Sequence, residues 1–129
     1  MARVEVEVET MVNPTESVDK VVRAVRNVLG EIDLEQTTSD DVTVLRTRMN
    51  GMESLNHLKN LLRQMKIRDT ARAKLSNSIR GNALVFGLNK QAAYAGRVSF
   101  YRYREAPLGP IQITISGDVD EVVQYLCEY

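Results

Sequence analysis

Hydrophobic and polar residues alternate strictly at the start of the chain, and this alternation predicts a β-strand. Valines at positions 4, 6 and 8 are separated by glutamates at positions 5, 7 and 9. Because successive side chains of a strand point to opposite faces, a period of two gives one apolar and one polar face. We therefore expect a strand over about residues 2–11, with its valines in the core and its glutamates in solvent.

The apolar spacing then changes to that of a helix. Asn13 followed by Pro14 and Glu16 predicts an N-cap, a proline at the first helical position and a capping-box partner. Apolar residues recur at helical spacing as far as Leu29, and Gly30 is expected to end the helix. Two supportive pairs of opposite charge lie four residues apart on this helix: Glu16 with Lys20, and Asp19 with Arg23.

The middle of the chain predicts one strand and two helices. Residues 37–41 are polar and are expected to form a connection, followed by a strand over residues 42–49 that ends at Asn50-Gly51. Leucines at helical spacing predict a helix over about residues 55–65, and a second helix is expected from about Asp69 to Ile79.

The second half is expected to be mostly strands. A strand is predicted over 84–88, followed by a hairpin connection over 89–96 and a second strand that begins at Val98 and continues through Tyr101-Arg102-Tyr103-Arg104. A loop over 105–110 then leads to a strand over 111–115. The final helix is expected to start at an Asp118 cap, with Glu121 as its capping-box partner. The resulting order predicts an α+β fold with a single domain over residues 1–129. We expect a two-layer sandwich in which a mixed or mainly antiparallel sheet of about five strands carries helices on one face.

Composition narrows the classes of protein that fit. With 129 residues, 43% of them hydrophobic and 26% charged, the chain is expected to form a folded domain. It has neither an apolar run near the ~18 to 20 residues of a membrane helix nor a signal-peptide core, so a cytoplasmic location is expected. One cysteine, Cys127, and one histidine, His57, exclude an internal disulfide and a Cys/His zinc site.

No catalytic constellation is recognisable. The sequence lacks a phosphate-binding glycine loop, a dinucleotide fingerprint, a metalloprotease helix motif and a nucleophile elbow. Adjacent carboxylates at Asp40 and Asp41 are more typical of a solvated turn than of a cation site. We therefore expect a protein that is not an enzyme and has no cofactor and no metal.

The formal net charge of zero conceals a strong segregation of charge. Residues 1–45 carry four basic and ten acidic side chains, for a net charge of −6. Residues 46–104 carry thirteen basic and two acidic side chains, for +11, and residues 105–129 carry five acidic and no basic ones, for −5. Clustered cations are typical of proteins that bind a polyanion. The alternative is that acidic and basic segments are neighbours in the fold and neutralise each other.

The basic segment supplies the candidate binding residues. On the helix over 55–65 the apolar stripe leaves Lys59, Arg63 and Lys66 on a solvent-facing side, and Arg72 and Lys74 flank the apolar stripe of the next helix. Solvated helix faces explain the same pattern.

The connection over 89–96 combines a cation, amide side chains, an aromatic ring and small residues. The candidates for RNA recognition in and after it are Asn89, Lys90 and Gln91, followed by Arg97 and Tyr101 as weaker ones. The alternative for this connection is an ordinary turn with a solvated Lys90, and for Tyr101 a packed face of a strand.

Four strings resemble a known family. They are Pro14-Thr15-Glu16, Asp69-Thr70-Ala71-Arg72, Leu88-Asn89-Lys90-Gln91-Ala92-Ala93 and Leu108-Gly109-Pro110-Ile111. Together they resemble an archaeal family of small proteins described as predicted RNA-binding and exosome-associated. The resemblance covers nearly the whole chain. It implies a two-layer fold similar to the large-subunit ribosomal protein that binds 5S rRNA, and it implies homodimers.

The resemblance also bears on activity and partners. Some members of the family are joined to a nucleotide-kinase-like domain that this chain lacks, so any phosphotransfer would belong to a separate partner. The family has no established catalytic residues to carry over. We therefore expect a non-enzymatic RNA-binding protein that acts in RNA processing or a ribosome-related context. The alternative is a dimeric interaction module that docks on a nucleotide-kinase-like partner protein.

Overall fold

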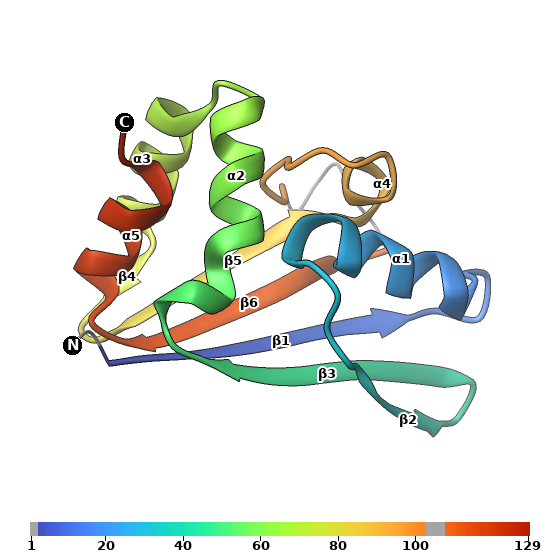
Figure 1. The fold of residues 1–129 in the computed structure, drawn as a ribbon. Coiled ribbons are helices and arrows are strands. Elements are labelled where there is room, and N and C mark those ends of the chain that lie inside the picture. The colour runs from blue at the N-terminus through green and yellow to red at the C-terminus, as the bar shows by residue number, and fades with distance from the viewer. Residues whose placement is uncertain (1–2, 103–107) are drawn as a thin grey trace.

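A single antiparallel sheet forms one layer of the fold, and the helices cover one of its faces (Figure 1). The computed structural model describes residues 3–102 and 108–129. The strands are β1 (Val4–Val12), β2 (Glu35–Ser39), β3 (Val42–Asn50), β4 (Ile79–Arg80), β5 (Ala83–Asn89) and β6 (Pro110–Gly117). They lie in the order β2-β3-β1-β6-β5-β4, and each neighbouring pair is antiparallel. The predicted α+β class is confirmed, with six strands in place of about five.

Within the described residues, the helical layer consists of five α-helices and one short 3-10 helix. Their bounds are α1 (Val18–Leu29), the 3-10 helix η1 (Met52–Leu55), α2 (Asn56–Gln64), α3 (Arg68–Asn77), α4 (Lys90–Tyr94) and α5 (Val119–Cys127). In Figure 1 all of them lie above the sheet, with α1 and α4 over one end and α3 and α5 over the other. None of the helices in the described ranges is long and apolar enough to cross a membrane.

Alternation places the core between the two layers. Val6 and Val8 of β1 are at most 1% exposed, and their cross-strand neighbours in β6, Ile115 and Ile113, are fully buried. The intervening glutamates point to the open face, where Glu7 and Glu9 stand directly opposite Arg48 and Arg46 of β3. Internal neutralisation is thus the correct interpretation for these two arginines, whose ion pairs measure 3.6 and 2.7 Å.

Two strands were not predicted, and the strand predicted from Val98 is not formed in its described part, which ends at residue 102. All five residues of β2 are polar and exposed, so no apolar alternation announces this strand. Asp40 and Asp41 have φ angles of +50° and +66° and form the two-residue turn from β2 into β3. The helix expected to reach Ile79 ends at Asn77, and Ile79 begins the two-residue strand β4.

The segment after β5 differs from the predicted hairpin. The expected connection contains helix α4. The strand expected from Val98 onward is reduced to one isolated bridge between Leu88 and Phe100. Half-buried Tyr101 donates its backbone N–H to the Gly87 carbonyl at 2.8 Å. The predicted continuation at Tyr103 and Arg104 lies outside the described residues.

Two predicted helix caps also have other roles. Helix α1 begins after Ser17, whose side chain accepts from the Lys20 N–H, and not at Asn13. The Asp118 side chain does not cap α5 but accepts the Arg3 N–H at 2.7 Å, which ties the start of β1 to the end of β6. The stop at Gly30 is confirmed, with φ of +93°.

Candidate nucleic-acid interface

Three predicted cations lie on two segments that contact each other at the C-terminal end of α2. Arg63 and Lys66 are exposed there, and Lys66 has a φ of +58°, the left-handed conformation in which the chain turns from α2 toward α3. The backbone N–H of Val98 lies 3.2 Å from Met65 Sδ, so the segment after α4 meets this end of α2 and brings exposed Arg97 to it. We call Arg63, Lys66 and Arg97 the α2 cation cluster.

Other predicted cations hold the end of α5. Lys59 forms an ion pair with Glu128 and lies 4.1 Å from the centre of the Tyr125 ring. Arg72 donates to the Cys127 carbonyl at 3.0 Å. Because the last carbonyls of a helix lack partners within it and carry partial negative charge, cations stabilise them. The charges of Lys59 and Arg72 are therefore used in part within the fold.

Arg68 belongs to the same arrangement and was missed in the sequence. Its guanidinium lies 3.9 Å from the centre of the Tyr129 ring and donates to the Glu128 carbonyl at 3.3 Å. The remaining predicted cation of α3, Lys74, is exposed. Neither Lys74 nor any member of the α2 cation cluster forms an ion pair within residues 3–102 and 108–129.

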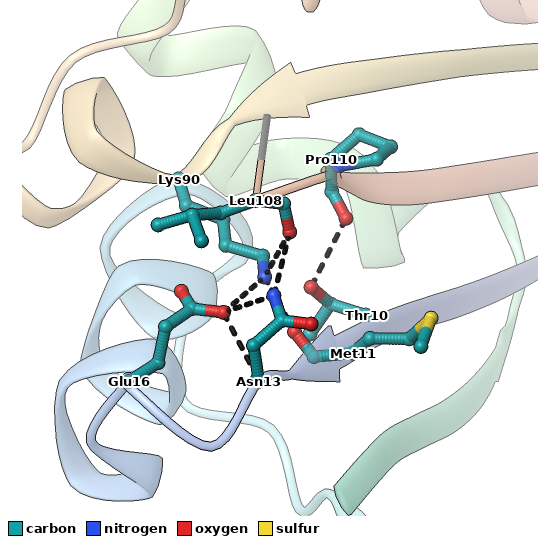
Figure 2. A network of polar contacts seen from close by, with 7 residues as sticks. All are labelled: Thr10, Met11, Asn13, Glu16, Lys90, Leu108 and Pro110. Carbon is teal, nitrogen blue, oxygen red and sulfur yellow. Dashed lines mark hydrogen bonds and ion pairs between the residues drawn. The ribbon is translucent and has the colours of Figure 1, made fainter. Parts of the chain in front are cut away.

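Lys90, predicted as an RNA contact, is instead a buried structural residue. Its side chain is 7% exposed. The ammonium donates to the carbonyl of Met11 at the end of β1, to the carbonyl of Leu108 before β6 at 3.0 Å, and to the Glu16 carboxylate at 3.0 Å (Figure 2). With three acceptors it has no donor left for a ligand. The alternative of a solvated Lys90 is wrong as well.

The other two residues predicted to recognise RNA in this segment, Asn89 and Gln91, differ in their contacts and exposure. Asn89 caps α4, because its side-chain oxygen accepts the Ala92 N–H at 2.9 Å. Gln91 is exposed on the first turn of that helix. Of Asn89, Lys90 and Gln91, only Gln91 therefore presents its side chain to solvent without a cap or a buried ion pair.

The pKa of the Glu16 carboxyl is set by its burial and by the groups that donate hydrogen bonds to it. Burial alone would raise its pKa, but hydrogen bonds from the Asn13 backbone N–H at 3.1 Å, the Lys90 ammonium and the Asn13 amide together hold the pKa below its usual range. A lowered folded-state pKa contributes stability that is present above the unfolded-state pKa and is lost as the pH falls through the folded-state pKa.

The free energy of unfolding of Glu16→Gln should therefore depend less on pH, between neutral pH and about pH 3, than that of the wild type. At pH 7 we expect this variant to unfold with about 2 kcal/mol less free energy than the wild type, because a charged hydrogen-bond acceptor is lost. The difference should shrink as the pH falls from neutral to about 3. Urea unfolding followed by circular dichroism at pH 7, 5 and 3 measures it. Parallel pH profiles of the two proteins would contradict this account of Glu16.

Metal-binding side chains do not gather in the described part of the chain, and its histidine and cysteine have structural surroundings. Over residues 3–102 and 108–129 there is no group of three or more His, Cys, Asp or Glu side chains that could hold a metal ion. His57 Nε2 lies 2.8 Å from the Asn27 carbonyl oxygen, where it joins the start of α2 to the end of α1. Burial raises the pKa of the Cys127 thiol, which favours its protonated and unreactive form.

Known proteins resemble this chain over most of its length. A family model described as RNA binding matches residues 5–117. A UPF0201 protein of Thermococcus onnurineus is 41% identical over 123 residues, which cover 95% of this chain and 90% of that protein. A UPF0201 protein of Sulfolobus acidocaldarius is 40% identical over 109 residues, covering 84% of this chain and 75% of the relative.

Solved structures show the same architecture. The crystal structure of a UPF0201 protein from Methanococcus jannaschii superposes with a TM-score of 0.86 at 31% identity, covering 95% of this chain and 98% of that one. A DUF54 protein from Methanothermobacter thermautotrophicus shares the fold, with a TM-score of 0.71 at 22% identity over 98% of this chain and 99% of that one. The chain therefore belongs to the family whose model is described as RNA binding, together with the archaeal UPF0201 proteins.

Proposed function

We propose that this protein binds RNA through its helical layer, without catalysing a reaction, and acts in RNA processing or a ribosome-related context. The observation that carries the proposal is the α2 cation cluster, whose three exposed cations lie on two contacting segments and form no ion pair among the described residues. Clustered cations bind phosphates by releasing condensed counterions. The description of the family model as RNA binding supports the same conclusion.

The open face of the sheet is the less suitable surface. At its centre the exposed arginines Arg46 and Arg48 are already paired with Glu9 and Glu7, and Glu5 is exposed beside them. An RNA strand on this face would meet carboxylates and would have to break existing ion pairs. The helical layer offers cations without that cost, and on α3 it adds Lys74 and the partly engaged Arg72.

Removing two members of the cluster tests the proposal. Arg63→Ala with Lys66→Ala should weaken binding to a labelled RNA about tenfold near 0.1 M salt, because two phosphate contacts are lost. The slope of log affinity against log salt should also become shallower by about 1.4 for a single strand. Fluorescence anisotropy with one hairpin RNA and one single-stranded RNA, each at several salt concentrations, measures both quantities.

The matched control removes the same number of positive charges from the other face. Arg46→Ala with Arg48→Ala changes the net charge equally but alters only the open face of the sheet. We expect its RNA affinity to stay within about twofold of the wild type, with circular dichroism confirming that both double variants are folded. If wild-type protein binds neither RNA at low salt, or if the two double variants weaken binding equally, the proposal is wrong.

A further inference from the structure

A groove runs along the contact between α1 and α4, and its α4 side includes Gln91, one of the residues predicted to recognise RNA. Helix α1 packs against α4. Two hollows of about 550 and 440 Å³ lie along this contact, and both are lined by Lys20 and Tyr94. Tyr94 is 44% exposed, and among the described residues it is one of five large hydrophobic side chains that are exposed. Hollows of this size are in the range that binds small organic groups.

The larger hollow is suited to a phosphate. Its charged lining consists of Lys20, Arg23, Arg26, Asp19 and Glu31. Arg26 is already engaged, since its Nε donates to the Ile32 carbonyl at 3.1 Å and lies 4.0 Å from Glu31. The expected pairs Glu16–Lys20 and Asp19–Arg23 are not formed, and within the described part of the chain Lys20 and Arg23 form no ion pair. These two cations remain for an anion.

The smaller hollow is suited to a planar base. Its lining includes Val21 and Ala24, which are nearly fully buried and supply apolar surface. Tyr94, Gln91 and Ser17 line it as well, beside the paired Glu16 and Lys90. An apolar surface, an aromatic ring and an amide that both donates and accepts are the groups that proteins use to hold an unpaired base.

The backbone that carries Tyr94, which lines both hollows, is held at both ends of its short helix. The Asn27 amide of α1 donates to the carbonyls of Ala93 and Tyr94 at 3.0 and 3.1 Å. At the other end, Lys90 is fixed by its buried contacts. Because this backbone is already ordered, stacking of a base on the Tyr94 ring would not require the helix to become ordered.

The groove also adjoins the α2 cation cluster. Arg97 follows Tyr94 by three residues, and its N–H donates to the Ala92 carbonyl at 2.9 Å. The next residue, Val98, reaches Met65 at the end of α2. One strand of RNA in the groove would therefore pass Arg97 on its way to Lys66 and Arg63.

We infer that the groove between α1 and α4 binds one unpaired nucleotide of an RNA strand. The base stacks on Tyr94 and is read by Gln91, and the adjoining phosphate lies between Lys20 and Arg23. This inference rests on the proposed function and deepens it, since it selects single-stranded RNA or an unpaired loop over a continuous duplex. Direct reading of bases in RNA requires such unpaired positions.

The test compares Tyr94→Ala with Tyr94→Phe, which keeps the ring. We expect Tyr94→Ala to weaken binding of a fluorescein-labelled single-stranded octamer about five- to thirtyfold, whereas Tyr94→Phe stays within about twofold. A 12-base-pair RNA duplex should be bound more weakly than the octamer and should be insensitive to Tyr94→Ala. In a second measurement, adenosine 5′-monophosphate is titrated into isotope-labelled wild-type protein, where amide NMR shifts should move at Lys20, Arg23, Gln91 and Tyr94.

The outcomes separate this inference from the proposed function. If Arg63→Ala with Lys66→Ala weakens RNA binding but Tyr94→Ala binds like Tyr94→Phe, the groove is wrong and the α2 cation cluster stands. If the wild type binds no RNA at low salt but the mononucleotide shifts the groove amides, the proposed function is wrong and the groove is a nucleotide site. Absence of both RNA binding and amide shifts overturns both.

Discussion

Replacing Lys90 with methionine is expected to lower the free energy of unfolding by about 3 to 5 kcal/mol, because it leaves a buried carboxylate without its cation. Methionine preserves most of the side-chain length and removes the charge, so the loss reports on the ammonium and its partners. Those partners come from three separate places in the chain: the end of β1, the turn before α1 and the residues before β6 (Figure 2).

The cost is large because each partner is left with unmet hydrogen-bonding capacity. Glu16 would keep its bonds from Asn13, but its carboxylate would lose the only cation within 4.0 Å among the described residues. The carbonyls of Met11 and Leu108 would lose a charged donor. A charged hydrogen bond contributes about 1.5 to 3 kcal/mol, and a buried group left unpaired loses its solvation as well.

Urea unfolding at pH 7 measures this effect, with Lys74→Met as the matched control. Lys74 is an exposed lysine of α3 without an ion pair among the described residues, so its replacement should change stability by less than about 0.5 kcal/mol. The double variant Lys90→Met with Glu16→Gln should recover part of the loss, because it removes the uncompensated charge. If Lys90→Met is no less stable than Lys74→Met, Lys90 does not hold these segments together.

Regular amphipathic patterns made most of the fold predictable. The alternation of β1 and the leucine spacing of α2 each bury one face, so the pattern in the sequence and the packing in the structure express the same constraint. The elements that were missed lack that constraint. Strand β2 exposes all five of its residues, and α4 is a five-residue helix that depends on the Asn89 cap.

The exposure of a candidate residue could be predicted only where the residue lies on the helix face opposite a stripe of apolar side chains. Arg63 could be placed in solvent because Leu58 and Leu62 bury the other side of α2. Lys90 could not, since the acid that neutralises it is 74 residues earlier in the chain and no local pattern links the two. The groove between α1 and α4 was missed for the same reason, because the i,i+4 spacing of Glu16 and Lys20 suggested a pair that the long-range contact with Lys90 replaces.

The basic middle segment therefore has three physical uses. Arg46 and Arg48 neutralise the acidic strand, Lys59, Arg68 and Arg72 stabilise the end of α5, and Lys90 anchors the buried cluster. The cations without such a role carry most of the charge that is available to a polyanion, and Arg72 adds the part of its guanidinium that is not engaged. A net charge of +11 over residues 46–104 thus overstates the charge that RNA would meet, and RNA binding depends on where the unpaired cations lie.

The junction of β6 with the start of β1 depends on a residue without a side chain. Gly117 has a φ of +113°, which side chains of L-residues rarely allow. A Cβ atom built on it would lie 2.0 Å from the carbonyl oxygen of Arg3, a backbone atom that cannot turn aside. The same carbonyl accepts the Asp118 N–H at 2.9 Å, and the Asp118 carboxylate accepts the Arg3 N–H. Any shift that relieves the clash therefore disturbs both of these bonds.

Gly117→Ala should lower the free energy of unfolding by about 4 kcal/mol, because backbone strain and a forced displacement of β1 each cost about 1 to 3 kcal/mol. Gly96→Ala is the matched control, since Gly96 also has a positive φ, +80°, but a Cβ there meets nothing within 4 Å. Its cost should be limited to about 1 to 2 kcal/mol for the left-handed conformation. Urea unfolding of the two variants separates the clash from the conformation, and equal losses would show that the contact with Arg3 yields without cost.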